Sequence, residues 1–170
     1  MKNPLFAEIT DMSGATPEHS EIITNFVIQV YTQLKDSSCR VYSDNIQYKW
    51  FVGDKTVTVI PDASINCRYR GRKGNYIVST PQFVMEVLSP STAKRDRTEK
   101  LEIYQSQEIP EYWIVDMKKR EIQIYDLDYD ENDVPKYHLI ETVTDANKKD
   151  LRLIHFPHIK IDFDKMFDVG

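Results

Sequence analysis

The sequence has little cysteine, little glycine and no long hydrophobic run, and each shortage excludes a class of protein. Its only cysteines are Cys39 and Cys67, with no CxxC pair, which argues against zinc fingers and disulfide scaffolds and favours reduced thiols in the cytoplasm. Five glycines cannot build a P-loop or a dinucleotide-binding loop here. No apolar stretch is long enough for a membrane helix, and residues 1–10 lack the pattern of a signal peptide.

Histidine and serine are present, but not in the spacing of common zinc or hydrolase sites. Ser89 and Ser91 lack the G-x-S-x-G setting of a serine hydrolase. A zinc site needs paired ligands, and the four histidines are scattered: His19, His138, His155 and His158. Of these, only His19, at the start of the first predicted helix, is expected near a cleft.

The composition fits one globular domain over residues 1–170. Hydrophobic residues make up 41% and charged residues 29% of the chain, as in soluble proteins with a substantial core. A net charge of −5 argues against a protein that binds polyanions through its overall charge. Four basic residues nevertheless gather in one segment: Arg68, Arg70, Arg72 and Lys73. They predict either a surface that faces nucleic-acid phosphates or an ordinary solvated loop.

The hydrophobic pattern predicts two helices and several strands. Helical spacing of apolar residues predicts a helix over residues 16–34, with Thr16 as its cap. Strands are predicted over residues 40–51, 56–60, 63–67, 82–88, 112–115, 121–127 and 137–143, with a break at 89–92 before a helix over 95–106. Residues 71–75 are predicted to form a loop, and 155–167 a short strand followed by a tail. This order predicts an α/β domain with a mixed sheet.

Two acidic residues and a lysine are the candidates for chemistry. Glu86 lies between apolar pairs inside a predicted strand, and Asp62 ends another strand. A carboxylate is costly to bury unless it binds a cation or hydrogen-bond donors. Two carboxylates from neighbouring strands suit Mg²⁺ or Mn²⁺ with water and phosphate as further ligands, and Lys100 on the next helix can orient a nucleophile. Asp62, Glu86 and Lys100 therefore predict a metal site that activates water at a phosphodiester.

Each of these residues also has a purely structural interpretation. Asp62 can end its strand by accepting backbone N–H bonds. Glu86 can face outward at a sheet edge or form a buried pair with a lysine or arginine. Lys100 can form a surface ion pair with Asp96, four residues earlier on the same helix. It is the combination of the three, rather than any one of them, that favours a metal site.

Several fragments, taken in order, carry a resemblance to a known family. They are Glu18-His19, Asp44 within residues 42–45, Pro61-Asp62, residues 86–92, Asp96, Lys100, Tyr104 and residues 111–116. Together they resemble the Uma2 family (DUF820), a branch of the restriction-endonuclease-like PD-(D/E)XK superfamily. The resemblance runs from the first predicted helix to residue 127, and residues 157–167 are also similar.

The resemblance implies a restriction-endonuclease-like αβββαβ core, with a mixed central sheet flanked by helices. It implies that Asp62 and Glu86 bind the metal, and that His19, Asp44 and Tyr104 support them near the cleft. The chain departs from the superfamily motif at one place. The third-strand position expected to be lysine is Leu88, and the family pattern implies that Lys100 takes over its role.

Two functional hypotheses follow. The first is an Mg²⁺- or Mn²⁺-dependent endonuclease that hydrolyses DNA phosphodiesters, with the basic segment at residues 68–73 meeting phosphates. Related nucleases often pair to cut two strands, so a homodimer is a reasonable expectation. The alternative is a non-catalytic module that binds nucleic acid or protein on the same scaffold, favoured by the acidic total charge and by Leu88. The sequence leaves the form of the substrate and its sequence preference open.

Overall fold

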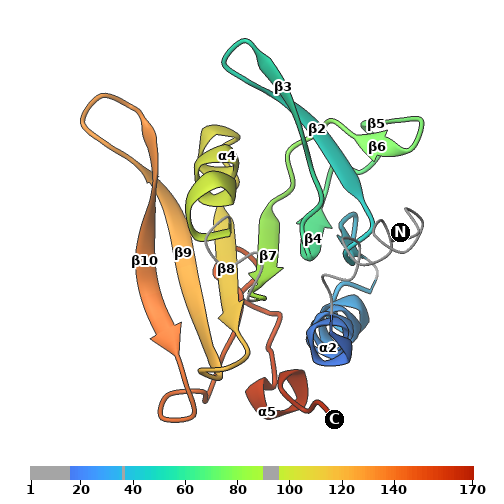
Figure 1. Cartoon of the computed structure of the whole chain (residues 1–170), viewed down its shortest axis with the longest axis vertical. Coiled ribbons are helices and arrows are strands. Elements are labelled where there is room, and N and C mark those ends of the chain that lie inside the picture. Colours follow the sequence, from blue (N-terminus) through green and yellow to red (C-terminus); the bar gives the residue numbers. More distant parts are fainter. Residues whose placement is uncertain (1–15, 36, 90–95) are drawn as a thin grey trace, which may run out of the picture.

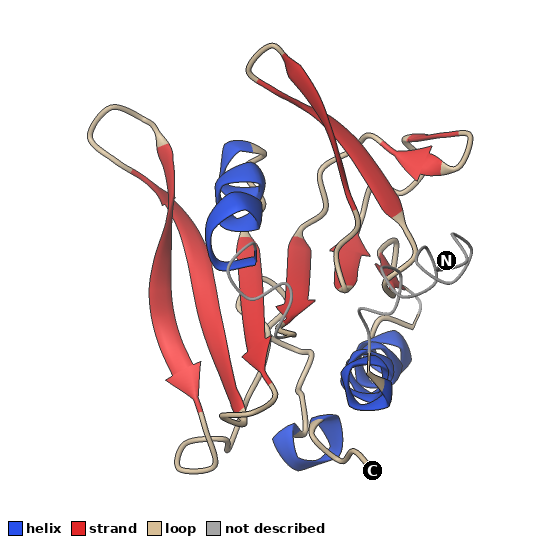
Figure 2. Cartoon of the chain, in the orientation of Figure 1, coloured by secondary structure: helices blue, strands red, loops and turns tan. Residues whose placement is uncertain are grey.

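A six-stranded mixed sheet forms the centre of the computed structural model, which describes residues 16–35, 37–89 and 96–170 (Figures 1 and 2). Its strands, in spatial order, are β1 (Arg40–Tyr42), β4 (Ala63–Asn66), β7 (Phe83–Val87), β8 (Glu111–Asp116), β9 (Glu121–Tyr129) and β10 (Pro135–Val143). β7 and β8 run parallel, and every other neighbouring pair is antiparallel. The mixed α/β fold predicted from the sequence is confirmed.

A smaller sheet of four strands lies beside the large one. Its strands, in spatial order, are β3 (Lys55–Val59), β2 (Gln47–Val52), β6 (Tyr76–Ile77) and β5 (Arg72–Lys73). The prediction of one strand over residues 40–51 is wrong, because β1 joins the large sheet and β2 the small one. The polar run Ser-Asp-Asn at 43–45 favours a turn between them. The loop predicted at 71–75 contains β5 and the turn into β6.

Helix α2 (Pro17–Gln33) covers one face of the large sheet. The Thr16 side chain caps it by accepting a hydrogen bond from the backbone N–H of His19 at 3.2 Å. The helix buries one apolar stripe, formed by Ile22, Ile23, Phe26 and Val30. Phe26 stacks on Phe83 of β7, with ring centroids 5.4 Å apart. The first predicted helix is thus confirmed. In the described part of the chain, no helix is long and apolar enough to cross a membrane.

The end of the chain closes the same core, and the prediction of a short strand and a tail is wrong. Arg152 and Lys160 form an isolated antiparallel bridge, and a short helix α5 (Phe163–Met166) follows. Apolar side chains of this segment are buried, namely Leu151, Leu153, Ile159, Ile161, Phe163 and Met166. Gln29 and Gln33 of α2 hydrogen-bond to its backbone. A four-residue helix is too short to show a helical period in the sequence.

The opposite face of the large sheet is covered by the small sheet and by helix α4 (Leu101–Ser106), which a π-helical turn η1 (Asp96–Lys100) precedes. Figure 1 shows α4 in front of β8. Strand side chains alternate between faces, so Met85 and Val87 of β7 pack toward α2, while Glu86 points to the α4 side. Residues 90–95, with most of the predicted break and the start of the second predicted helix, lie outside the described residues.

The cysteines are joined, contrary to the prediction of reduced thiols. A disulfide links Cys39, just before β1, to Cys67, just after β4. Because β1 and β4 are antiparallel neighbours that pair Arg40 with Asn66, the residues that flank this pair meet across the sheet. The pairing depends on strand register, which the separation of 28 residues in the sequence does not reveal.

Candidate active site

Asp62 lies at the start of β4, where its side chain continues the hydrogen bonding of the sheet. Its Oδ2 accepts a hydrogen bond from the backbone N–H of Val87 at 2.7 Å. The antiparallel register pairs Ala63 with Met85, which places position 62 opposite Glu86. The carboxylate therefore ends the β4–β7 pairing, as the structural interpretation has it, and lies beside the second candidate acid.

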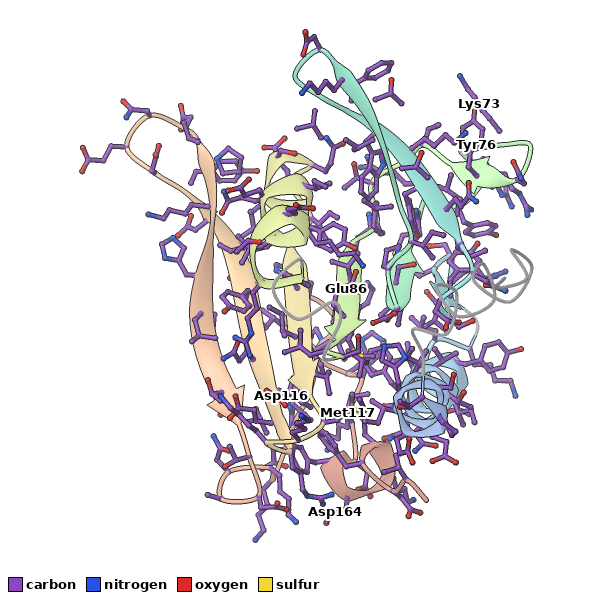
Figure 3. The ribbon with its side chains drawn as sticks, in the orientation of Figure 1. Lys73, Tyr76, Glu86, Asp116, Met117 and Asp164 are labelled. Atoms are coloured by element: carbon purple, nitrogen blue, oxygen red, sulfur yellow. A yellow bond between two sulfur atoms is a disulfide. The ribbon has the colours of Figure 1, made fainter. Side chains whose placement is uncertain are left out.

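Glu86 is buried in the middle of the molecule, between α4 and the small sheet (Figure 3). Only 1% of its surface is exposed, and two side chains of the following helix contact one of its oxygens. The Nζ of Lys100 lies 2.8 Å from Oε1, and the hydroxyl of Tyr104 donates to the same Oε1 at 2.5 Å. A buried carboxylate needs this kind of compensation.

Lys100 and Tyr104 reach Glu86 together because they are four residues apart at the junction of η1 and α4, and side chains at this spacing share one face of a helix. The Lys100 side chain is 12% exposed and lies against Glu86, while the surface pair with Asp96 stays a prediction, because the side chain of Asp96 lies outside the described residues. The buried glutamate–lysine pair, which was the structural alternative for Glu86, is observed. This pair is also the arrangement that a lysine beside a metal-binding acid requires.

His19 connects α2 to the two strand ends. Its Nε2 lies 3.0 Å from the carbonyl oxygen of Val87 and 3.3 Å from Oδ2 of Asp62. The hydrogen bond with Asp62 raises the pKa of His19, against the opposing effect of burial. Asp44 lies in the exposed turn between β1 and β2. It contributes through its charge, which raises the pKa of His19 further, rather than through a contact with Asp62 or Glu86.

Tyr104 is fully buried, and it is held in place from two sides. Its ring makes edge contacts with Trp50 of β2 at 6.4 Å and with Tyr112 of β8 at 5.2 Å between centroids. Burial and, after it, the charge of Glu86 raise the pKa of its phenol well above the ordinary range. Tyr104 therefore stays protonated and acts as a fixed hydrogen-bond donor to Glu86.

The basic residues of the predicted phosphate surface lie apart from these groups. Arg68 and Arg70 follow β4, Arg72 and Lys73 form β5, and all four are exposed. Within the described ranges, no ion pair joins any of them to Asp62 or Glu86. These basic residues lie in and before the small sheet. A substrate that contacts both them and the acids Asp62 and Glu86 must therefore extend from one group to the other.

Sequence reasoning missed one buried carboxylate, Glu111 at the start of β8, which is 0% exposed. It accepts hydrogen bonds from the indole N–H of Trp113 and from the backbone N–H groups of Ile154 and His155, at 2.7 to 3.0 Å. Burial raises its pKa, and these donors oppose the rise. The signal was available, because Glu111 directly precedes an apolar run just as Glu86 interrupts one.

The donor set suits a hard cation that keeps several of its own ligands. The described residues hold no group of three or more His, Cys, Asp or Glu placed around one ion. The register of β4 and β7 places Asp62 opposite Glu86, and Oδ1 of Asp62 accepts no hydrogen bond from any described residue. Mg²⁺ is commonly bound through one or two carboxylates with water and phosphate, so the residues present fit such an ion.

The mixed sheet flanked by helices has the architecture of the restriction-endonuclease-like class of proteins. Residues 7–154 match the Uma2 family, described as "Putative restriction endonuclease". This match covers most of the chain, and the chain belongs to the Uma2 family.

Two individual proteins are similar to the chain. The crystal structure of a putative nuclease belonging to DUF820 from Anabaena variabilis superposes with a TM-score of 0.69 at 16% identity, and the match covers 90% of this chain and 82% of that one. This likeness concerns the fold. An uncharacterized protein of Synechocystis sp., slr1290, is 29% identical over 119 residues, which are 69% of this chain and 62% of that protein. The chain thus spans about three fifths of the length of this relative.

Proposed function

We propose that the chain is a metal-dependent endonuclease that hydrolyses DNA phosphodiester bonds with Mg²⁺ or Mn²⁺. The observation that supports it most is the contact of Lys100 Nζ with Glu86 at 2.8 Å, beside Asp62 on the neighbouring strand. Lys100 contacts Glu86, and the strand register places Asp62 opposite Glu86, so three residues from separate elements support one site. Membership of a family described as "Putative restriction endonuclease" supports the same reaction.

In this proposal, Asp62 and Glu86 hold the ion through their carboxylate oxygens. A bound divalent ion lowers the pKa of water and stabilises negative charge on the scissile phosphate. Lys100 carries a positive charge at Glu86, where it can donate a hydrogen bond to the attacking water or to a phosphate oxygen. The π-helical turn η1 sets the register that brings Lys100 there, and such turns are frequent at functional sites.

Two further residues keep the acids in position. Tyr104 donates to Oε1 of Glu86, which fixes the rotamer of that side chain. His19 contacts Oδ2 of Asp62, while Val87 N–H donates to the same oxygen. With Oδ2 held from two sides, Oδ1 is the oxygen of Asp62 that is turned toward a ligand.

The test is a calorimetric titration of Mg²⁺ and Mn²⁺ into the wild type and Asp62→Asn, with cleavage of plasmid and single-stranded DNA measured on the same samples. We expect metal binding and cleavage in the wild type and the loss of both in Asp62→Asn. Glu102→Gln is a matched control, because Glu102 is an exposed acid on α4, and it should retain both. Cleavage that survives in Asp62→Asn contradicts the proposal.

The second candidate function is a non-catalytic module that binds nucleic acid or protein. The observation that favours it is that Oε1 of Glu86 is already occupied by Lys100 and Tyr104, as in a pair that only stabilises the fold. A wild type that binds no metal and cuts no DNA, while it remains folded, supports this candidate. Size-exclusion chromatography of the same samples tests the proposed homodimer.

A further inference from the structure

The outer edge of the small sheet carries a concentration of positive charge and aromatic rings that the proposed cleavage chemistry does not use. Residues 40–76 hold seven lysines and arginines against three aspartates, a surplus of four positive charges in a chain whose net charge is −5. Lys73 and Tyr76 lie there, away from Glu86 (Figure 3). The positive charge is therefore concentrated in the part of the chain that contains the small sheet and the adjoining strands β1 and β4 of the large sheet.

Cations lie over tyrosine rings in the small sheet and at the neighbouring edge of the large sheet. Lys49 of β2 lies over the Tyr76 ring, with Nζ 4.2 Å from the centroid. The guanidinium of Arg40 lies over the Tyr69 ring at 4.8 Å. Such pairs fix the orientation of a ring and leave its remaining surface available for stacking. Arrays of basic and aromatic side chains are the usual surface for single-stranded nucleic acid.

A small cavity lies beside Tyr76. Its volume is about 150 Å³, and its lining includes Tyr42, Arg72, Gly74, Asn75 and Tyr76. This is well below the roughly 300–1,000 Å³ of pockets for drug-sized ligands, so the cavity suits a single planar ring. Two phenol rings offer stacking, an amide offers a donor and an acceptor for a base edge, and a guanidinium offers charge for a phosphate.

The turn between β5 and β6 forms one side of the cavity. Gly74 has φ +62°, and a side chain there would meet nothing within 4 Å. Burial raises the pKa of the Tyr42 phenol, while the positive charges of Arg72 and Arg40 oppose the rise. These two cations are therefore close to the ring that forms the wall of the cavity.

Strand β2 joins this edge to the candidate active site. Its inward side chains, Tyr48 and Trp50, pack toward the large sheet, where Tyr48 hydrogen-bonds to Ser64 at 2.9 Å and Trp50 contacts the ring of Tyr104. Its outward Lys49 lies over Tyr76. The same rigid strand thus positions the ring that holds Glu86 and the cation at the cavity.

We propose that the small sheet binds single-stranded DNA and that the cavity between Tyr42, Arg72 and Tyr76 receives one unstacked base. This inference rests on the proposed function, because it specifies single-stranded DNA as the substrate of the proposed nuclease. A base in a duplex is stacked and paired, and it can enter such a cavity only after it leaves the helix. The compact positive edge then holds the phosphates on either side of the inserted base.

The test is fluorescence anisotropy of the full chain in EDTA, where no metal-dependent cutting occurs. The probes are a twelve-nucleotide oligothymidine, an abasic strand with the same number of phosphates, and a duplex of equal length. We expect the wild type to bind oligothymidine about tenfold more tightly than the abasic strand, because stacking of one base contributes that order of affinity. Equal affinity for both single strands, or tighter binding of the duplex, overturns the proposal.

Three variants locate the effect. Tyr76→Ala should lose the preference for oligothymidine over the abasic strand, and Tyr76→Phe, which keeps the ring, should retain it. Tyr31→Ala is the matched control, since Tyr31 is a 69% exposed tyrosine on α2, and it should bind like the wild type. An unchanged preference in Tyr76→Ala contradicts the proposal. If Tyr76→Ala fails to fold by circular dichroism, Lys73→Glu replaces it and should weaken binding to both single strands.

The outcome is separable from that of the proposed nuclease. A wild type that prefers oligothymidine in EDTA but cuts no DNA with Mg²⁺ or Mn²⁺ supports this surface and contradicts the nuclease. A wild type that cuts DNA but binds the abasic strand equally well supports the nuclease and contradicts the base cavity.

Discussion

Two glutamates are buried in neighbouring parallel strands, and their surroundings differ in kind. Glu86 of β7 is 1% exposed and Glu111 of β8 is 0% exposed. Glu86 contacts a lysine and a tyrosine of a following helix. Glu111 is held by backbone N–H groups and an indole, and no lysine or arginine in the described part of the chain pairs with it.

The comparison shows that burial alone does not identify a functional acid. Backbone donors fix a loop against a strand, and their geometry leaves no room for exchange with a ligand. A lysine ammonium on a helix can move from a carboxylate to a water or a phosphate. The partner, rather than the burial, therefore distinguishes the candidate catalytic glutamate from the structural one.

The largest expected effect is that of Glu86→Gln on cleavage. We expect the cleavage rate to fall on the order of 10²- to 10³-fold. The variant removes a negative charge from the proposed metal site and leaves Lys100 without its carboxylate partner. The measurement is single-turnover cleavage with saturating Mn²⁺. If the activity of the variant stays within a factor of about three of the wild type, Glu86 has only a structural role, like Glu111.

The variant Glu86→Gln with Lys100→Met separates stability from chemistry. Removal of one partner from a buried ion pair costs about 3–5 kcal/mol, whereas replacement of both is often neutral or stabilising. Urea unfolding should therefore show that the double variant regains most of the free energy of unfolding lost in Glu86→Gln, while cleavage stays absent. Recovery of cleavage in the double variant contradicts the role given to Lys100.

Glu111→Gln should have the opposite profile. The glutamine side chain has an NH₂ donor where glutamate has a second acceptor oxygen, and this donor faces the N–H groups of Ile154 and His155. We therefore expect the free energy of unfolding to fall by about 1–3 kcal/mol. Cleavage per folded molecule should be unchanged. A Glu111→Gln variant that remains as stable as the wild type and loses cleavage contradicts the purely structural role of Glu111.

Tyr104→Phe tests the positioning of Glu86 with a smaller change. The loss of one hydrogen bond to a charged acceptor should cost about 1.5–3 kcal/mol at most, and we expect cleavage to fall by roughly tenfold. Tyr137→Phe is a matched control, since Tyr137 is another buried tyrosine of the same core whose hydroxyl donates to a backbone carbonyl instead. It should lower stability without lowering the rate of the folded enzyme.

The smallest expected effect is the pH dependence of Glu111. Burial raises its folded-state pKa above the ordinary value of 4.5, so the folded state binds a proton more tightly than the unfolded state. Its contribution to the free energy of unfolding therefore falls as the pH rises from 4.5 through the folded-state pKa. Urea unfolding at several pH values should show a smaller difference between the wild type and Glu111→Gln at the higher pH values.

Local pattern was enough to predict most elements of the fold. Helix α2 follows from its apolar stripe and its Thr16 cap, and β7 follows from an apolar run bounded by turn residues. The sequence could not predict that residues 40–51 divide between two sheets. The partners of a strand are set by the whole fold and not by the alternation of apolar and polar residues. The Cys39–Cys67 bond was missed for the same reason, since it depends on the register of β1 and β4.

The candidate site was predictable in its residue types and less so in its contacts. Asp62 and Glu86 stand out as acids among apolar residues, and Lys100 lies on the next predicted helix, where the family resemblance also implies its role. The shared contact of Lys100 and Tyr104 with one oxygen depends on a π-helical turn, which has no reliable signature in a single sequence. Glu111 was overlooked because its donors, at residues 154 and 155, come from a segment 43 and 44 residues further on.

The distance along the chain between Glu111 and its donors has a consequence for synthesis on the ribosome. When residue 150 has been made, every residue assigned to cleavage already exists, but the backbone donors to Glu111 do not. A carboxylate without donors opposes the burial of β8, the strand beside β7. The nascent chain therefore gains the donors that stabilise the burial of Glu111 in the central sheet only after residues 154 and 155 emerge.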